Sequence, residues 1–185
     1  MGNYWLHFQY VLLFAFITGT LFFGHQALAE SEQITITNIN YDETISSFSV
    51  SANLENFDTS GVLQILLIVY DPNGFSSSEL ISLSSDSSDF EVITPDLRGF
   101  VMIESVTIDV DVVSIDAFVL GIDSTDAKVG LFLQNESNNN VLDFSSIDSE
   151  SSNDDNLSCE QLTELIDSSM IPSEIGEALL AKSGC

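Results

Sequence analysis

The side chains that support most enzyme chemistry are confined to the N-terminal apolar stretch of this chain. Its two histidines, His7 and His25, and its single tryptophan, Trp5, all lie before residue 30. We expect export to remove this stretch, which leaves the mature chain without an imidazole. A Ser-His-Asp or Cys-His nucleophile and an imidazole zinc site are therefore excluded. Two cysteines are also too few for a thiolate zinc site.

Carboxylates supply the remaining chemistry, because all 29 acidic residues follow the apolar stretch. A pair of carboxylates can hydrolyse a glycosidic bond, one acting as acid and the other as base or nucleophile. Sugar sites also commonly stack aromatic rings on the substrate, but no Trp follows residue 30 and most Phe residues fit core positions. We therefore predict that the protein is not an enzyme, with a carboxylate-only glycoside hydrolase as the last alternative.

Calcium is a more natural ligand for clustered oxygens, because it takes about six to eight ligands from carboxylates, amides and carbonyls. The candidate clusters are Asp123 with Asp126, Asp109 with Asp111, Asp71 with Asn73, and residues 148–155. None has EF-hand spacing, and each cluster alone is more often a solvated turn. The alternation around Asp109 and Asp111 places both on one face of a strand, which favours a surface role for that pair.

The charge balance limits the partners of this chain. Its formal net charge is −26, and its three basic residues are far apart in sequence. Nucleic acid and anionic lipid surfaces are excluded, because both require clustered Lys and Arg. Cationic partners remain open. A solvated acidic surface suited to salt or divalent cations is the plainer explanation of the acidity.

The N-terminal stretch resembles a secretory signal peptide. An apolar run over 11–23 is followed by Ala27 and Ala29, which form an A-x-A cleavage site. We expect the mature protein to begin at Glu30 and to be secreted, with nothing after cleavage that enters a membrane. Because no Lys or Arg precedes the run, an uncleaved signal anchor is the alternative.

Alternation of apolar and polar residues predicts an all-β domain over 30–147. The segment 47–54 shows the pattern best, with Phe48 and Val50 on one face and serines on the other. The expected strands are 34–37, 47–54, 62–70, 79–84, 90–93, 100–104, 106–112, 115–122, 129–134 and 141–144. Short strands separated by Ser, Asn, Asp and Gly indicate an antiparallel β-sandwich.

The expected strand over 62–70 differs from the others because it is apolar on both faces. It should be covered twice or contact a partner. It ends at Asp71-Pro72-Asn73-Gly74, a sequence typical of a turn. The stretch 48–74 resembles a strand pair of an immunoglobulin-like or fibronectin-like module, so we expect an immunoglobulin-like sandwich.

Past an acidic Ser/Asn-rich linker over 148–157, the period becomes helical, and 158–185 predicts a helical hairpin. Ser158 and Gln161 are placed to form a capping box, and Pro172 suits the first turn of a second helix. Folding the hairpin brings Cys159 and Cys185 together, so we expect a disulfide there. Closing that loop contributes roughly 3 to 4 kcal/mol.

These features together predict a secreted, acidic, non-enzymatic protein that acts in cell-surface or matrix adhesion or in assembly. Ile34 and Ile36 are the expected anchors of an N-terminal strand that completes either its own sheet or that of a neighbouring subunit. A secreted module that binds a small ligand or saccharide is the alternative function. Asn135 and Asn156 begin N-glycosylation sequons.

Overall fold

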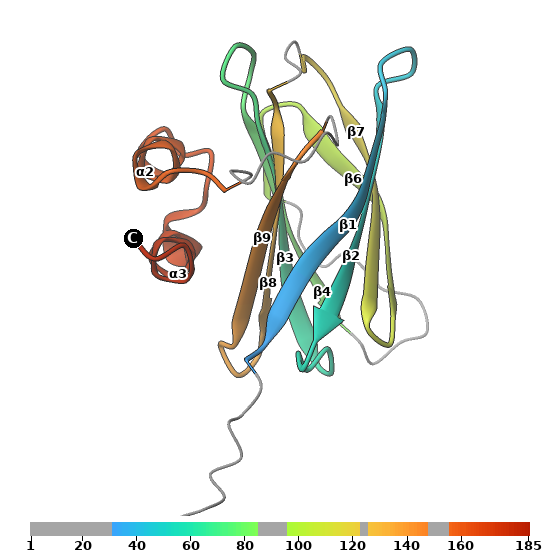
Figure 1. Cartoon of the computed structure of the whole chain (residues 1–185), viewed down its shortest axis with the longest axis vertical. Coiled ribbons are helices and arrows are strands. Elements are labelled where there is room, and N and C mark those ends of the chain that lie inside the picture. The colour runs from blue at the N-terminus through green and yellow to red at the C-terminus, as the bar shows by residue number, and fades with distance from the viewer. Residues whose placement is uncertain (1–30, 85–95, 123–125, 148–155) are drawn as a thin grey trace, which may run out of the picture. The chain divides into compact units, whose positions relative to one another are not determined.

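Two antiparallel β-sheets and two short helices make up the part of the chain that this computed structural model describes, residues 31–84, 96–122, 126–147 and 156–185 (Figure 1). The four-stranded sheet has the order β1-β2-β7-β6. Its strands are β1 (Gln33–Asp42), β2 (Ser47–Glu55), β7 (Val112–Val119) and β6 (Val101–Asp109). The five-stranded sheet has the order β5-β4-β3-β8-β9. Its strands are β5 (Asp96–Arg98), β4 (Ser77–Ser84), β3 (Val62–Tyr70), β8 (Lys128–Asn135) and β9 (Asn140–Ser146).

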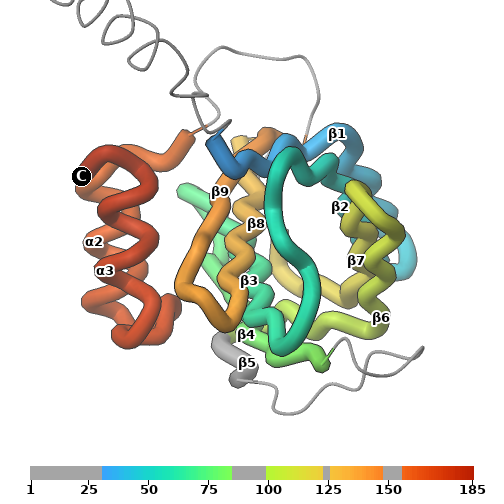
Figure 2. The backbone as a smooth tube through the Cα atoms, turned by 90° about the horizontal axis from the view of Figure 1, so that it is seen from below, coloured from blue at the N-terminus to red at the C-terminus, as the bar shows by residue number. Residues whose placement is uncertain are grey.

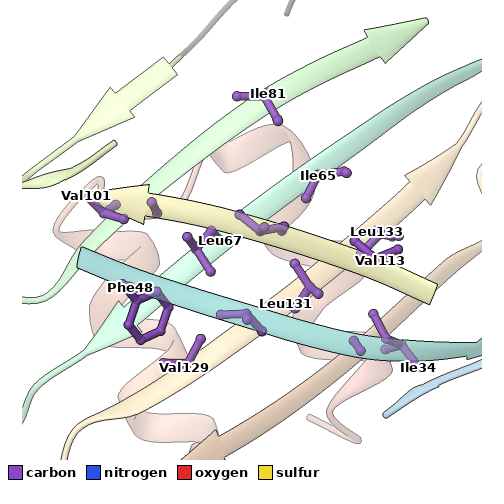
Figure 3. Packing of buried hydrophobic residues seen from close by; sticks show 14 of the residues in the cluster. Ile34, Phe48, Ile65, Leu67, Ile81, Val101, Val113, Val129, Leu131 and Leu133 are labelled. Carbon is purple, nitrogen blue, oxygen red and sulfur yellow. The ribbon is translucent and has the colours of Figure 1, made fainter. Parts of the chain in front are cut away.

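The inner faces of the two sheets share one hydrophobic core. Phe48 of β2, Leu67 of β3 and Leu131 of β8 are fully buried in it (Figure 3). Each comes from a strand whose core-facing residues are apolar at every second position, which is how a pleated strand buries one face. The predicted all-β fold is confirmed in this respect, and the alternation of β2 predicted its core residues correctly.

Strand β3 is buried on both faces. Ile65 and Leu67 face the core between the sheets, whereas Leu66 and Ile68 belong to a second apolar cluster. That cluster is completed by the helices α2 (Cys159–Asp167) and α3 (Ser173–Lys182). Figure 2 shows the two helices beside the five-stranded sheet, on the side away from the four-stranded sheet. The prediction that this strand is covered twice is therefore confirmed.

The helical hairpin forms as its sequence predicts. Ser158 caps α2 in a capping box with Gln161. Pro172 occupies the N-cap position of α3 rather than its first turn, so this helix begins one residue later than expected. The predicted disulfide joins Cys159 to Cys185, with a Cα–Cα distance of 5.6 Å. It closes the hairpin at its open end.

Polar contacts attach this hairpin to the sheet in addition to the apolar cluster. Gln161 Nε2 donates to Tyr70 Oη at 3.0 Å. The buried Ser78 hydroxyl of β4 donates to the carbonyl of Met170 in the turn between the helices. These two bonds join the hairpin to β3 and β4.

Two β-bulges explain where the strand predictions were wrong. Ile103 and Val106 both face the core, because the register with β7 shifts between Ile103 and Ser105. The alternation of apolar and polar residues changes phase there. The sequence pattern therefore predicted two strands, 100–104 and 106–112, where the structure has the single strand β6. A shift between Ile36 and Asn38 likewise interrupts the pattern of β1, which continues to Asp42. An extra residue in one strand produces this change of phase.

The expected strand over 106–112 contains a hairpin turn. Strand β6 ends at Asp109 and β7 begins at Val112, so Val110 and Asp111 form the turn between them. Val110 is 78% exposed and has φ of +52°. A β-branched residue rarely adopts this conformation, so the sequence contained no turn signal here. The expected strand 90–93 lies outside the described residues.

Candidate functional site

Exposed apolar side chains gather at one end of the two sheets. Figure 1 shows the β1–β2 turn and the β3–β4 turn at this end. Five large apolar side chains are exposed on the segments that meet there, and we call them the apolar end: Ile45, Phe75, Phe100, Met102 and Leu120. Phe75 is 68% exposed and Ile45 is 63% exposed. A concentration of this kind on one surface is typical of an interaction site.

Direct contacts join the segments of the apolar end. The rings of Phe75 and Phe100 lie edge to face with centroids 6.0 Å apart. The backbone N–H of Leu120 donates to the carbonyl of Phe100 at 3.0 Å. The N–H of Val119 donates to the carbonyl of Ser46, also at 3.0 Å, which brings Ile45 beside the end of β7. The exposed side chains therefore come from segments that contact one another directly.

The turn before Phe75 is held by Asp71, whose side chain is only 3% exposed. Asp71 Oδ1 accepts from the backbone N–H of Asn73 at 2.9 Å, as the sequence predicts for this turn. A Cβ on Gly74 would lie 2.4 Å from Asp71 Oδ2 and 2.9 Å from the carbonyl oxygen of Gly121. Only glycine lets the β3–β4 turn approach the segment after β7 so closely.

A second turn holds Phe100. The backbone N–H of Phe100 donates to Ser77 Oγ at 2.9 Å. Gly99 has φ of +87°, and a Cβ there would lie 2.6 Å from the same hydroxyl oxygen. Both phenylalanines of the apolar end therefore stand on glycine-dependent turns anchored by buried polar side chains. The conformations of these two turns leave Phe75 68% exposed and Phe100 52% exposed.

Acidic residues border the apolar end. Asp42 is the last residue of β1, Glu43 begins the β1–β2 turn, and Asp126 is exposed in the segment that leads into β8. Asp42 accepts hydrogen bonds from the Thr44 hydroxyl at 2.6 Å and the Thr44 N–H at 2.9 Å. Both bonds lower the pKa of Asp42, and the bond from the Thr44 hydroxyl has the larger effect. Arg98, at the end of β5, is the basic residue closest in sequence to these segments.

The predicted metal ligands are distributed over both ends of the sheets. Asp109 and Asp111 flank the exposed Val110 in the β6–β7 turn, so they do not share the strand face that the sequence predicted. Asp126 is exposed, and Asp123 lies outside the described residues, as does the cluster over 148–155. Among the residues that the structure describes, no group of three or more His, Cys, Asp or Glu side chains is placed to hold a metal ion. Calcium at Asp123 and Asp126 stays a prediction.

The predicted assembly strand lies in its own sheet. Ile34 of β1 is buried in the core between the sheets, and Ile36 packs against that core from a partly buried position. The backbone N–H of Ile36 donates to Asp143 Oδ2 of β9 at 2.7 Å. Exchange of this strand between subunits stays a prediction.

Sequence reasoning placed most phenylalanines in the core and so missed the apolar end. A signal was present, because Phe75 and Phe100 each directly follow a glycine in a turn, where a side chain has no sheet face to pack on. Two buried polar residues were also missed. Glu79 accepts from the backbone N–H of Ile103, and Asn135 organises the β8–β9 turn.

Neither of the described helices is long and apolar enough to cross a membrane. No family model, curated protein or solved structure matches this chain.

Proposed function

We propose that this chain is an exported, non-enzymatic binding protein built on an immunoglobulin-like β-sandwich, and that it attaches to a partner through its apolar end. The observation that carries the proposal is the exposure of Phe75 and Phe100 on glycine-dependent turns that contact each other. Burying such side chains against a partner would remove their apolar surface from water, which favours binding. The disulfide between Cys159 and Cys185 is consistent with an oxidising, extracellular environment.

Strand order supports the immunoglobulin-like part of the proposal. The order β1-β2-β7-β6 corresponds to strands A, B, E and D of that fold, and β4-β3-β8-β9 corresponds to C′, C, F and G. The short strand β5 then occupies the place of C″. The chain departs from antibody domains in two respects. Its disulfide lies in the helical hairpin rather than between the sheets, and its single tryptophan, Trp5, precedes β1.

Bead attachment tests this function. Beads coated with the disulfide-bonded protein should adhere to the cells that naturally produce it, or to one another. The double variant Phe75→Ser/Phe100→Ser should lose this adhesion. Val112→Ser is the matched control, because Val112 is also an exposed apolar residue but lies at the opposite end of β7. Equal adhesion of the wild type and the double variant would refute the proposal.

Saccharide binding is a second candidate function, favoured by the outer face of the four-stranded sheet. Cross-strand neighbours there carry hydroxyl and carboxylate groups. Ser105 Oγ donates to Asp116 Oδ2 at 2.8 Å, and the hydroxyl oxygens of Ser51 and Ser114 lie 3.4 Å apart. Met102 pairs with Phe118 beside them. Polar groups next to an apolar surface suit a sugar ring, which has both kinds of face.

A glycan array probed with the labelled protein distinguishes the two candidates. Binding that is lost in Asp116→Ala but kept in Phe75→Ser/Phe100→Ser would favour the saccharide module. A glycosidase screen on any glycan that binds should detect no turnover, since we propose no catalytic group. Turnover would instead favour the carboxylate-only hydrolase.

A further inference from the structure

We infer that the partner of the apolar end is a cationic amphipathic protein segment, with apolar side chains flanked by Lys or Arg, and that it is not a second copy of this chain. This inference rests on the proposed function and specifies the chemistry of the partner.

The first step of the argument is the charge around the apolar end. The segments that carry it, 42–46, 71–76, 99–102 and 120–122, include the exposed acids Asp42 and Glu43, and the exposed Asp126 follows the last of them. Arg98 directly precedes Gly99, so one basic residue adjoins these segments and the exposed acids outnumber it. Of the two other basic residues, Lys128 begins β8 opposite Tyr70, and Lys182 belongs to the last turn of α3. Lys128 Nζ donates to the carbonyl of Asn156 at 3.0 Å, which directs it to the start of the hairpin.

The second step excludes a second copy of the chain. A two-fold interface uses the same surface of each subunit, so two copies joined through the apolar end would both bring Asp42 and Glu43 to the interface. The Thr44 hydrogen bonds favour one position of the exposed Asp42 carboxylate. The formal net charge of −26 on each chain adds long-range repulsion. A partner with positive charges at the rim would instead be attracted.

The third step concerns the apolar contacts. Phe75 and Phe100 are aromatic, exposed and in contact with each other, and aromatic side chains often dominate binding energy at interfaces. Charge alone would select any polycation, whereas apolar anchors require matching apolar side chains in the partner. The partner must therefore combine the two kinds of group in one segment.

Fluorescence anisotropy with three labelled peptides of equal length tests the inference. The probe alternates Leu and Lys, the first control replaces Leu by Ser, and the second replaces Lys by Glu. We expect only the Leu/Lys peptide to bind at low ionic strength. Phe75→Ser/Phe100→Ser should weaken this binding about tenfold or more, as expected for two anchor residues. Asp42→Asn/Glu43→Gln should weaken it several-fold and reduce its salt dependence, while Val112→Ser should leave it unchanged.

Three results would overturn the inference. Equal binding of the Ser/Lys peptide would show unspecific attraction to an acidic protein. Equal binding of the Leu/Glu peptide would show that charge is irrelevant, although docking at the apolar end would survive. Sedimentation equilibrium completes the test. A wild-type dimer that dissociates in Phe75→Ser/Phe100→Ser would identify a second copy as the partner, which rejects the cationic segment but keeps the proposed function.

Discussion

Asp143 of β9 accepts a hydrogen bond from the backbone N–H of Ile36 in β1 at 2.7 Å, and this bond joins the edge strands of the two sheets. The opposite side of the sheets has a counterpart, where Glu79 of β4 accepts from the backbone N–H of Ile103 in β6. Each isoleucine directly precedes the extra residue of a β-bulge. In both places, a carboxylate of the five-stranded sheet thus satisfies a backbone donor of the other sheet.

Asp143→Ala should reduce the free energy of unfolding by about 1 to 3 kcal/mol, because it leaves the N–H of Ile36 without this acceptor. Asp143→Asn is the matched control, since its amide oxygen can accept the same bond without the charge. We therefore expect Asp143→Asn to retain most of the stability. Urea denaturation of both variants measures the difference, and equal losses would show that the charge, not the hydrogen bond, is what matters.

Glu79→Gln should change the dependence of stability on pH. Burial raises the pKa of Glu79 above its ordinary value of 4.5, and the hydrogen bond from Ile103 only partly opposes this. The folded wild type therefore binds the proton more tightly than the unfolded chain, so stability falls as pH rises from 4.5 through the folded-state pKa. Glutamine keeps an acceptor oxygen and removes the charge. We expect Glu79→Gln to exceed the wild type in stability at pH 7.

Urea denaturation between pH 4 and pH 8 at constant ionic strength measures this effect. The advantage of Glu79→Gln should shrink as the pH falls through the folded-state pKa towards 4.5, because Glu79 of the folded wild type then binds a proton and loses its buried charge. An advantage that is the same at every pH would mean that the glutamine acts through packing instead.

Val110→Asn should stabilise the protein. Val110 is a β-branched residue with φ of +52°, a conformation that costs about 1 to 2 kcal/mol and that asparagine tolerates better. Because the side chain is mostly exposed, the substitution removes little packing. We expect a gain of about 1 kcal/mol and a rise in Tm of roughly 3 °C by calorimetry. Asp111→Asn, at the neighbouring position without a positive φ, should have no such effect.

The two sequons should behave differently in a host that glycosylates secreted proteins. Asn135 is only 6% exposed, and its Nδ2 donates to the carbonyl of Asp58 at 3.2 Å. Its Oδ1 accepts from the N–H groups of Ser137 and Asn139. A glycan on Nδ2 has no room in this arrangement, whereas Asn156 is exposed. We expect peptide mass spectrometry to find the glycan on Asn156 of the folded, secreted protein.

Variants check this assignment. Asn156→Gln should remove the glycan and leave the fold intact. Asn135→Gln should lower Tm without changing the glycan, because it disrupts the β8–β9 turn. A glycan on Asn135 in a natively folded product would contradict the assignment.

Local patterns determined much of the fold. Period-two alternation identified β2, and a run that is apolar on both faces identified β3 and its double burial. The capping box at Ser158 and the helical spacing predicted the hairpin, and therefore the pairing of Cys159 with Cys185. These features depend on residues that are near one another in sequence or on a simple period, so no knowledge of distant contacts is needed.

The tertiary structure decided where the pattern breaks and what remains exposed. The bulges after Ile36 and Ile103 depend on how each edge strand meets the other sheet, and the turn at Val110 adopts a conformation that its residue type disfavours. The exposure of Phe75 and Phe100 depends on packing between segments far apart in sequence. A phenylalanine has the same hydrophobicity in a core and at a surface, so only the arrangement of its neighbours determines which of the two it occupies.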